Sequence, residues 1–483
     1  MGITSEETMA VMEVRNPRSG EMDYRFDPTS AAEVEAKAKK AREAQRAWFS
    51  GGLERRIAIL KKWAESLGRH AADITAALSV DTGRTRISHE ELGAVEHFIH
   101  GYCEAAPQVL AQPFRKFSHN DEIIFKTTLV PYPLVGVISP WNFPLVLSFI
   151  DAIPALVAGA AVMIKPSEVT PRFVEPLQRS IDDVPELAGI ITLVRGAAET
   201  GQAVVANSDA IVFTGSIATG RKIAVAAAQA FIPAFLELGG KDPAVVLAGS
   251  DLARAATSIL RSAIYNTGQV CYAIERVYVD ASVHDDFVAE LLRQAATLRR
   301  SFAAGDGGHY GPFIFEAQGG IVQAQLQDAV ARGAKILSGG KVETVDGAIW
   351  LDPTIVTDVD HTMKIMAEET FGPVVPVMKF KTIEEAAHLV NDSVFGLSGA
   401  VFGPDTHTAG DFATLMEAGG VSINDTELQR GMMFDGEKTA FKMSGMGGSR
   451  YGATSILRYV RKRALIANEG GIKPLTELAE IEA

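Results

Sequence analysis

The sequence predicts an α/β protein whose parallel sheets are covered by helices on both faces. The first observation is that short apolar segments alternate with helical ones from about residue 130 onward. The strand-like segments are Val135–Ser139, Ala161–Lys165, Ile190–Val194, Ala210–Phe213 and Ala244–Leu247. Such alternation is typical of parallel sheets buried between helices. The second observation is composition: 47% of the 483 residues are hydrophobic and 22% are charged, as in soluble globular proteins of two to three domains.

Helices are predicted in the N-terminal part and between the strands. Ser30 is a suitable N-cap for a helix over Ala31–Trp48, which is rich in Ala, Lys and Glu. Glu54–Leu78 is predicted as a second helix because apolar residues recur on one face of it. The helices expected between strands are Leu145–Ala158 and Thr219–Ala230.

A second alternating region follows a domain boundary that we place near Leu247–Asp251. Its expected strands are Arg276–Asp280, Val374–Lys379 and Gly399–Phe402, and its expected helices are Val283–Thr297, Ile321–Arg332 and Ile383–Asn391. The later segment Ser455–Ile466 is strand-like and basic. We interpret it as a solvated or subunit-crossing strand in preference to a nucleic-acid contact.

Charge and cysteine content limit the classes of partner. The net charge is −13, which argues against nucleic acid or an anionic membrane, because both select for clustered cations. Two cysteines, Cys103 and Cys271, make a disulfide framework improbable and favour a reducing compartment. The charge-free stretch Thr127–Ile150 contains four prolines, which a membrane helix does not tolerate well. We expect a cytoplasmic protein, without a membrane segment and without a metal site.

Two segments have the chemistry of a nucleotide site, although both GxGxxG after a strand and GxxxxGK[ST] are absent. The strand that runs into Phe213-Thr214-Gly215-Ser216 ends at a turn whose amides and hydroxyl suit a phosphate. An ordinary strand-to-helix turn explains the same pattern. Lys165 and Glu168 follow another strand, where parallel sheets bind ligands, and both suit ribose hydroxyls. A carboxylate at 168 would repel a 2′-phosphate and so favours NAD over NADP, but a surface turn with two solvated charges is the alternative.

Cys271 and Glu237 are candidates for a nucleophile and a general base. Cys271 lies in a short Gly-containing connection after a helix, where a side chain can face a cleft. Lowering the pKa of this thiol to about 7 would raise its reactive fraction roughly 15-fold. The alternative is an inert buried thiol, which is our interpretation of Cys103. Glu237 stands between leucines and before two glycines, so partial desolvation would raise its pKa toward that of a general base; a salt bridge with Lys241 is the alternative.

Taken together, the motifs resemble the aldehyde dehydrogenase superfamily over nearly the whole chain. They occur in the family's order: Pro140-Trp141-Asn142-Phe143-Pro144, Lys165-Pro166-Ser167-Glu168, Phe213-Thr214-Gly215-Ser216, Glu237-Leu238-Gly239-Gly240-Lys241, Gly268-Gln269-Val270-Cys271 and Glu369-Thr370-Phe371-Gly372-Pro373. The spacings also agree, with 34 residues from Glu237 to Cys271 and 98 from Cys271 to Glu369. Each motif alone is weak, but six in order are specific.

The resemblance implies a catalytic set and a cofactor site. By it, Cys271 attacks the aldehyde carbon, the Asn142 amide and the Cys271 N–H hold the oxyanion, and Glu237 activates water to hydrolyse the thioester. By the same resemblance, Lys165 and Glu168 contact the adenine ribose, Ser216 the pyrophosphate and Glu369 the nicotinamide ribose. The full set expected around NAD is Ile138, Ser139, Trp141, Lys165, Glu168, Phe213, Gly215, Ser216, Leu238, Glu369 and Phe371.

The family fold implies a division of the chain. Residues 1–116 and 134–247 would form a Rossmann-like, parallel-sheet NAD-binding domain, and residues 248–454 a second α/β catalytic domain. Residues 117–133 and 455–466 would form a small β oligomerisation arm, followed by a tail at 467–483. Family members are dimers or tetramers, so we expect a homodimer or a homotetramer through the exposed edge of the arm.

One position departs from the family pattern, because Tyr272 follows the nucleophile where a smaller residue is usual. We expect Phe143, Leu147, Tyr272 and Phe434 around the substrate. This apolar, partly aromatic set favours an aromatic or medium-chain aldehyde, and the lack of an Arg or Lys among these positions slightly disfavours semialdehydes. Two alternatives stay open: acyl transfer from the thioester to coenzyme A, which the presence of Glu237 disfavours, and a non-catalytic binding role on the same fold.

Overall fold

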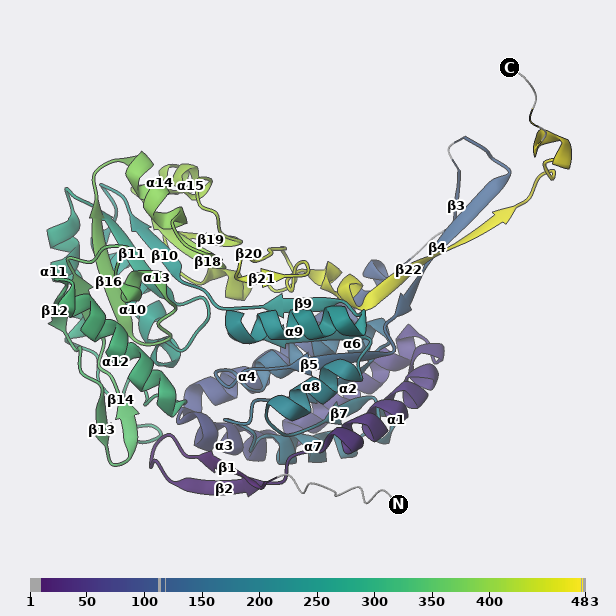
Figure 1. The fold of residues 1–483 in the computed structure, drawn as a ribbon, viewed down its shortest axis with the longest axis horizontal. Helices are drawn as coiled ribbons and strands as arrows, with labels where there is room; N and C mark the ends of the chain where they lie inside the picture. The colour runs from purple at the N-terminus through teal and green to yellow at the C-terminus, as the bar shows by residue number, and fades with distance from the viewer. Residues whose placement is uncertain (1–9, 112–113, 118, 479, 481–483) are drawn as a thin grey trace.

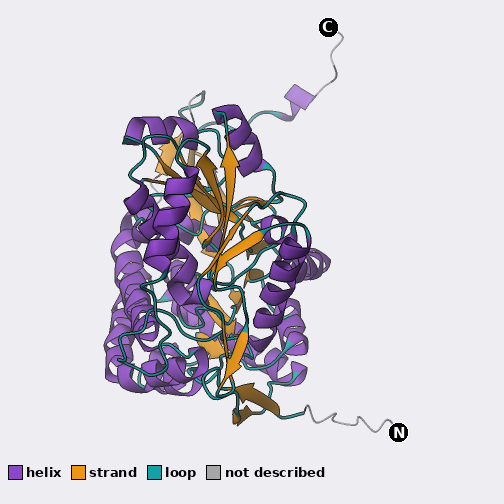
Figure 2. Cartoon of the chain, turned by 90° about the vertical axis from the view of Figure 1, so that its left-hand side faces the viewer, coloured by secondary structure: helices purple, strands orange, loops and turns teal. Residues whose placement is uncertain are grey.

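The computed structural model describes residues 10–111, 114–117, 119–478 and 480. It contains two large sheets, each packed against helices (Figure 1). A view turned by 90° shows strands running through the centre with helices to either side of them (Figure 2). The α/β architecture predicted from the alternation of strands and helices is therefore confirmed. Among the residues described, no helix is both long and apolar enough to cross a membrane.

The first sheet has six strands in the order β21-β9-β8-β5-β6-β7. Their bounds are β5 Leu134–Ile138, β6 Ala161–Lys165, β7 Ile191–Leu193, β8 Ala210–Thr214, β9 Ala234–Glu237 and β21 Gly445–Met446. All neighbours are parallel except β21, which runs antiparallel to β9. Ile138 pairs with Lys165 and Phe213, and Thr214 pairs with Glu237, so the carboxyl ends of four strands meet at one edge.

The second sheet has seven strands in the order β12-β15-β16-β11-β10-β18-β19. Their bounds are β10 Asp242–Val246, β11 Ile274–Asp280, β12 Lys335–Ser338, β15 Thr354–Thr357, β16 Val374–Phe380, β18 Ser398–Phe402 and β19 Gly420–Ile423. β12 is antiparallel to β15, and the other neighbours are parallel. Fully buried strands such as β10 and β18 account for the continuous apolar runs seen in the sequence.

The helices that cover the two sheets follow the chain order. Their bounds are α1 Ala31–Ser50, α2 Leu53–Arg69, α3 Ala71–Thr82, α4 Thr85–Val109, α5 Val146–Phe149, α6 Ala152–Ala158, α7 Val174–Asp182, α8 Ala198–Ala206, α9 Ile217–Ala230, α10 Leu252–Ile264, α11 His284–Ala295, α12 Glu316–Ala331, α13 Lys364–Ala367, α14 Ile383–Asn391 and α15 Thr406–Ala413. The smaller β elements pair as β1 Met12–Arg15 with β2 Met22–Phe26, β13 Glu343–Val345 with β14 Ala348–Trp350, and β17 Phe395–Gly396 with β20 Phe441–Lys442.

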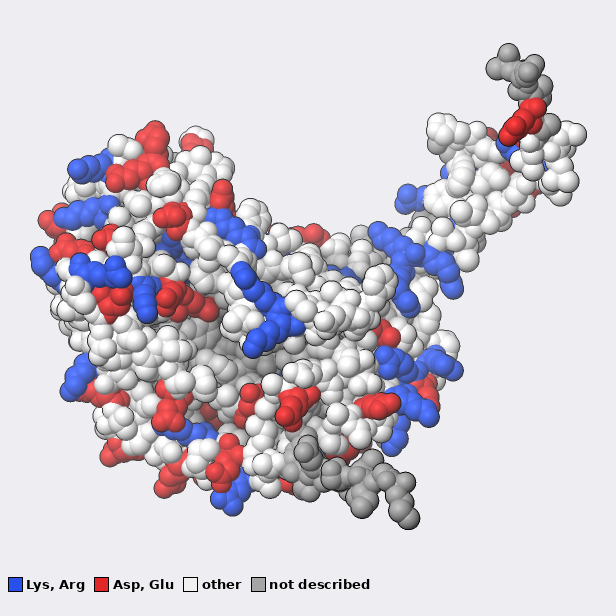
Figure 3. Space-filling view, in the orientation of Figure 1, with Lys and Arg blue, Asp and Glu red and all other residues white. Residues whose placement is uncertain are grey.

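A three-stranded β arm extends away from the rest of the molecule (Figure 1). It consists of β22 Val460–Asn468, β4 Ile123–Pro131 and β3 Phe114–Lys116, and β22 pairs antiparallel with β4 along its whole length. Lys and Arg side chains gather where the arm leaves the body (Figure 3). The predicted arm segment 117–133 and the predicted tail 467–483 each include residues outside the described ones, at 118, 479 and 481–483.

Four sequence predictions differ from the structure. The helix expected at Leu145–Ala158 is two helices, α5 and α6, because Pro154 lacks an N–H and its ring excludes the carbonyl four residues earlier. The helix expected at Glu54–Leu78 is interrupted at His70, whose ring contacts Asp183. The strand expected from Ser455 begins only at Val460 and follows a 3₁₀ helix over Ala453–Tyr459.

The fourth difference concerns how two strands are assigned to the sheets. A boundary near Leu247–Asp251 groups β10 with the first sheet, but β10 pairs with β11 and β18 in the second. Conversely, β21 belongs by sequence to the second region and pairs with β9 in the first sheet. A buried apolar strand has the same sequence pattern in either sheet, so only the pairing distinguishes them.

Candidate active site

A cavity of about 630 Å³ lies at the carboxyl edge of the first sheet and extends toward the second. Ligands of open parallel sheets bind at this edge. The sequence-predicted residues that line it are Ile138, Ser139, Trp141, Asn142, Leu147, Lys165, Glu168, Phe213, Gly215, Ser216, Glu237, Leu238, Cys271, Glu369 and Phe371. Residues that are 233 positions apart in the chain thus share one cavity, with the Cys271 thiol and three glutamates among them.

One part of the cavity is polar and suits a ribose and a phosphate. Lys165 is buried, and its Nζ donates to the Glu168 carboxylate at 3.1 Å and to the Pro166 carbonyl at 3.2 Å. The Glu168 side chain is 39% exposed, so it remains open to a ligand. Ser216 is the N-cap of α9, where its hydroxyl oxygen accepts from the Thr219 N–H at 3.3 Å. This helix terminus presents amides toward anions.

The opposite part of the cavity contains Glu369, which lies directly against a glycine. A Cβ on Gly239 would come within 2.5 Å of Glu369 Oε2, so a larger residue at 239 would displace the Glu369 carboxylate from this position. Glu369 Oε1 accepts from the Gly240 N–H at 3.1 Å. Burial, together with the charge of Glu275, raises the pKa of Glu369 to about 8.

A buried ion pair holds the loop that carries Glu369 and Phe371. Lys241 Nζ lies 2.9 Å from Glu275 Oε2, and both side chains are at most 3% exposed. Glu275 also accepts from the N–H groups of Thr370 and Phe371, each at 2.7 Å. Phe371 has φ of +52°, a left-handed conformation that its surroundings must impose. The salt bridge considered between Lys241 and Glu237 does not form, because Lys241 points to Glu275 and Thr370.

Aromatic rings line the same region of the cavity. Trp141 meets the Phe371 ring edge-on with centroids 5.4 Å apart, and meets the Phe315 ring at 5.8 Å. Phe315 was not identified from the sequence, nor were the other lining residues Gln202, Thr219, Lys222, Gln318 and Ile321. None of them belongs to a motif, and no local pattern distinguishes them from ordinary surface residues.

The thiol of Cys271 follows a strained connection between α10 and β11. Asn266, Thr267 and Gly268 have φ of +52°, +58° and +72°, so three successive residues are left-handed. The side chains of this connection tie it together: Asn266 Nδ2 donates to the Gln269 carbonyl at 3.1 Å, and Gln269 Nε2 donates to the Asn266 carbonyl at 2.9 Å. Strain of this kind is typical of functional sites, where surrounding contacts hold it in place.

The pKa of the Cys271 thiol is not lowered in the structure. Burial raises it to about 12, and the negative charges of Glu369 and Asp242 act in the same direction. The protein therefore holds the resting thiol in its neutral form. Cys103, which was predicted to be buried packing, is 2% exposed in the first core.

Asn142 is buried beside the thiol connection. Its Nδ2 donates to the Gln269 carbonyl at 2.9 Å, and its own backbone carbonyl accepts from Asn266 Nδ2 at 3.0 Å. One N–H of the Asn142 amide is thereby used, and the other remains to serve as a donor. Asn142 and Cys271 both line the cavity.

Glu237 faces two buried arginines. Its Oε1 lies 3.5 Å from Arg458 Nη2 and 3.8 Å from Arg450 Nε. Both arginines also pair with Asp151, which is 1% exposed and accepts from the Tyr459 hydroxyl at 2.7 Å. Burial alone would raise the pKa of Asp151, but the two guanidinium groups hold it below its usual range. The cluster keeps Glu237 at the end of β9 in a cationic environment.

Three of the four residues predicted around the substrate lie together. Phe143, Leu147 and Tyr272 belong to an apolar cluster with Ile87, Val146, Tyr265, Val270 and Ala273, and the rings of Phe143 and Tyr265 stack at 6.0 Å. Phe434 does not join this cluster. Its ring packs edge-on against His97 and Tyr102 of α4, with centroids at 5.3 and 5.0 Å.

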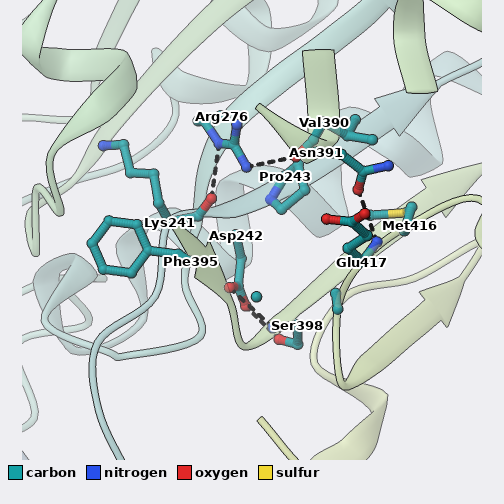
Figure 4. Close-up of a pocket in the computed structure, with 12 residues that line it drawn as sticks. Lys241, Asp242, Pro243, Arg276, Val390, Asn391, Phe395, Ser398, Met416 and Glu417 are labelled. Atoms are coloured by element: carbon teal, nitrogen blue, oxygen red, sulfur yellow. Dashed lines mark hydrogen bonds between the residues drawn. The ribbon is translucent and has the colours of Figure 1, made fainter. Parts of the chain in front are cut away.

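A second cavity, next to Asp242, is too small for a substrate. Its volume of about 10 Å³ is at the lower limit for one water molecule. Figure 4 shows the hydrogen bond that the Ser398 hydroxyl donates to the Asp242 carboxylate. It also shows the hydrogen bond that Arg276 Nε donates to the carbonyl of Lys241. Burial raises the pKa of Asp242 to about 7. Over the described part of the chain, no group of three or more His, Cys, Asp or Glu side chains is placed to hold a metal ion.

Comparison with known proteins agrees with this geometry. The sequence model of the Aldehyde dehydrogenase family matches residues 3–465, and the chain belongs to this family. A curated relative is "Putative succinate-semialdehyde dehydrogenase (NADP(+))" of Mycolicibacterium smegmatis, which is 32% identical over 444 residues, 90% of this chain and 84% of that protein.

Solved structures have the same fold. A putative aldehyde dehydrogenase, PutA from Anabaena variabilis, superposes with a TM-score of 0.94 at 45% identity, covering 96% of this chain and 99% of that one. Betaine aldehyde dehydrogenase from Staphylococcus aureus, solved with NAD⁺, superposes with a TM-score of 0.90 at 28% identity, covering 96% of each chain. The predicted aldehyde dehydrogenase fold and family are therefore confirmed.

Proposed function

We propose that this protein oxidises an aldehyde to its carboxylic acid with a nicotinamide dinucleotide as oxidant. The observation that carries the proposal is that Cys271, Asn142 and Glu237 line one cavity together with Glu369 and Phe371. A nucleophile, an oxyanion donor and a carboxylate base are the groups that an acyl-forming oxidation followed by hydrolysis needs.

In the proposed reaction, Cys271 Sγ forms a bond to the aldehyde carbon as its proton passes to Glu237. The carbonyl oxygen becomes an oxyanion held by the Asn142 amide and the Cys271 N–H. A hydride leaves this carbon, for which the oxidised nicotinamide, when bound, supplies the acceptor, and the carbon becomes a thioester. Glu237 releases the first proton to solvent and then takes a proton from water. The hydroxide oxygen bonds to the thioester carbon, the C–S bond breaks to release the acid, and the Cys271 thiolate recovers its proton from Glu237.

The cavity fits a dinucleotide, and we propose NAD in preference to NADP. A volume of about 630 Å³ is in the range of cofactor sites, and Gly239 leaves the space beside Glu369 that a side chain would fill. Lys165 and Glu168 would hold the adenine ribose, the α9 terminus at Ser216 the pyrophosphate, and Glu369 the second ribose. Support for NAD comes from Glu168, since its partly exposed carboxylate would repel a 2′-phosphate. The M. smegmatis relative is named for NADP⁺, so the preference needs a direct test.

We propose an aromatic or medium-chain apolar aldehyde as the substrate class. The support is the cluster of Phe143, Leu147 and Tyr272 with Tyr265, which presents aromatic and aliphatic surface next to the Cys271 loop. Leu147 belongs both to this cluster and to the cavity lining, so it links the two. The relative's name makes semialdehydes a necessary comparison.

We also propose that the protein is a homodimer or homotetramer assembled through the β arm, and that it acts in the cytoplasm. β22 is exposed after Val460, and its apolar residues Leu465 and Ile466 are 47% and 62% exposed. An exposed strand of this kind can pair with a second copy. Both cysteines are free, as a reducing compartment would keep them.

One assay tests the proposed reaction, cofactor and substrate class together. Reduced-nicotinamide absorbance is followed with aromatic, aliphatic and semialdehyde substrates, each with NAD and with NADP, for the native protein and for Cys271→Ala. We expect NADH formation that Cys271→Ala abolishes, a higher kcat/KM with NAD, and free acid as the product even when coenzyme A is added. Acyl-CoA as the main product would replace hydrolysis with acyl transfer, and cofactor binding with no turnover on any aldehyde would contradict the proposed activity.

A further inference from the structure

A second buried ion pair lies behind the proposed oxyanion donor. Arg84, the residue before α4, contacts Glu91 on the second turn of that helix, with Nη2 to Oε1 at 2.8 Å. The two side chains are 8% and 2% exposed. Neither residue belongs to the motifs of the sequence analysis, and neither lines the large cavity.

The pair binds both ends of the segment that begins with Asn142. Arg84 Nη2 donates to the Asn142 carbonyl at 2.6 Å. Glu91 Oε2 accepts from the N–H groups of Leu145 and Val146, at 2.9 and 3.1 Å. The Arg84 guanidinium also lies over the Phe143 ring, 4.6 Å from its centroid. Five consecutive residues, four of them in contact with one ion pair, are thereby fixed relative to α4.

Stability alone explains this arrangement poorly. Two charges lose their hydration in a buried pair. A protein with apolar side chains of similar volume in place of the pair is often as stable. Arg84 Nε and Nη1 are moreover buried, and among the described residues neither atom has a hydrogen-bond partner, which adds to the cost. What an apolar pair cannot provide is directed hydrogen bonds to one carbonyl and two N–H groups of the 142–146 backbone.

We propose that Arg84 and Glu91 are positioning residues that fix the Asn142 peptide, so that its side-chain amide donates to the oxyanion. Through the Asn142 carbonyl the pair also shares a partner with Asn266, whose amide binds the loop before Cys271. The pair therefore fixes the position of the Asn142 amide relative to the loop that precedes Cys271, and it does not itself contact substrate. This inference rests on the proposed function, because it assigns the pair a part in the same oxyanion site.

The test uses Arg84→Lys, which keeps the charge but loses the planar fork that reaches Glu91 and Asn142 together. The matched control is Arg86→Lys, two residues further on, where the pair with Glu90 is exposed (69% and 40%). Two rates are measured: aldehyde oxidation, and release of 4-nitrophenolate from 4-nitrophenyl acetate. In the second, thiolate attack on the ester carbon expels nitrophenolate through an oxyanion and needs neither aldehyde nor cofactor.

We expect Arg84→Lys to lower kcat for both reactions roughly 10- to 100-fold, since a misplacement of about 1 Å costs up to that much. KM, the cofactor Kd and the rate of Cys271 alkylation should stay near the native values. The melting temperature should fall modestly, because one buried acceptor loses its donor, and Arg86→Lys should match the native protein throughout. Added to Asn142→Ala, Arg84→Lys should change either rate less than about twofold, because the donor that it positions is already absent.

Four outcomes would count against the positioning role or the proposed function. An unchanged kcat in Arg84→Lys, or an equal further loss in the Asn142→Ala background, would overturn the positioning role. If the native protein released nitrophenolate but oxidised no aldehyde, the proposed function would fail while the positioning role was still tested. If it released nitrophenolate no faster than Cys271→Ala, the thiol would not be the nucleophile, and both would fall.

Discussion

Replacing Glu275 with Gln should weaken both the fold and the cofactor site, through different contacts. Glu275 accepts from Lys241 Nζ at 2.9 Å and from the N–H groups of Thr370 and Phe371 at 2.7 Å each. Gln is nearly isosteric, so the change creates no cavity. It removes the negative charge opposite a lysine that is fully buried, and it leaves one acceptor oxygen where there were two.

The expected losses can be sized from these contacts. Removing one partner of a buried pair costs about 3–5 kcal/mol of unfolding free energy. We expect the lower end, about 3 kcal/mol, because Lys241 keeps the Thr370 hydroxyl at 2.6 Å. Phe371 loses a charged hydrogen bond that holds its left-handed backbone, worth about 1.5–3 kcal/mol. Half of that, passed to the cofactor site, raises the cofactor Kd about 4- to 13-fold.

Urea unfolding and cofactor titration of four proteins separate the two effects. The proteins are the native form, Glu275→Gln, the double variant Lys241→Met with Glu275→Gln, and the control Glu477→Gln, which alters an exposed pair with Lys473. The double variant should regain much of the lost stability, because the unpaired charge is gone, but should still bind cofactor weakly. The control should lie within about 0.5 kcal/mol of the native protein.

Either of two results would refute this reasoning. If Glu275→Gln binds cofactor with the native Kd, the contacts of this carboxylate with Thr370 and Phe371 do not contribute to cofactor binding. If the double variant is no more stable than Glu275→Gln, the loss of stability does not come from the unpaired Lys241 charge.

Three further predictions follow from single side chains. Burial raises the pKa of Glu369 to about 8, so ribose hydroxyls meet an ionised acceptor only above that pH. The cofactor Kd should therefore fall from pH 6.5 to 9 in the native protein and stay level in Glu369→Gln. A level profile in the native protein would contradict this. Because the pKa of the Cys271 thiol is about 12, the rate of its alkylation by iodoacetamide in cofactor-free protein should rise with pH and reach no plateau below pH 10. A plateau near pH 7 would mean an activated thiol. Ser30 and Glu33 form a capping box on α1. Ser30→Ala should lower the free energy of unfolding, measured in urea, by about 1 kcal/mol. A change under about 0.3 kcal/mol would show that the cap is dispensable.

The sequence predicts an element well where its ends carry local signals. The strand Ala161–Lys165 and the helix Ile383–Asn391 have the expected bounds, and Thr382 caps the latter through the Glu385 N–H. Where the end depends on a distant contact, the prediction fails. The 3₁₀ helix before β22 is such a case, since Ser455 bonds to the Tyr102 hydroxyl and Tyr459 to Asp151. Nothing near residue 455 indicates these partners.

The same distinction applies to the site. Motif residues such as Glu237 and Glu369 are recognisable because local chemistry and spacing identify them, and they line one cavity as expected. Their partners are not recognisable, since each comes from elsewhere in the chain. Glu237 was paired by proximity in sequence with Lys241, yet its cationic neighbours are Arg450 and Arg458, more than 200 residues away.

Buried charge is what these unpredicted partners share. The pairs Arg84–Glu91, Lys241–Glu275 and Arg450–Asp151 are each at most 8% exposed, and each touches a different part of the site. Burying each pair costs desolvation free energy that apolar packing would avoid. Each pair also provides hydrogen bonds of fixed direction. Those of Arg84–Glu91 go to the Asn142 segment, those of Lys241–Glu275 go to the Phe371 loop, and those of Arg450–Asp151 go to the surroundings of Glu237. In the proposed site, the motifs would supply the reactive groups, and the buried pairs would hold those groups in place relative to one another.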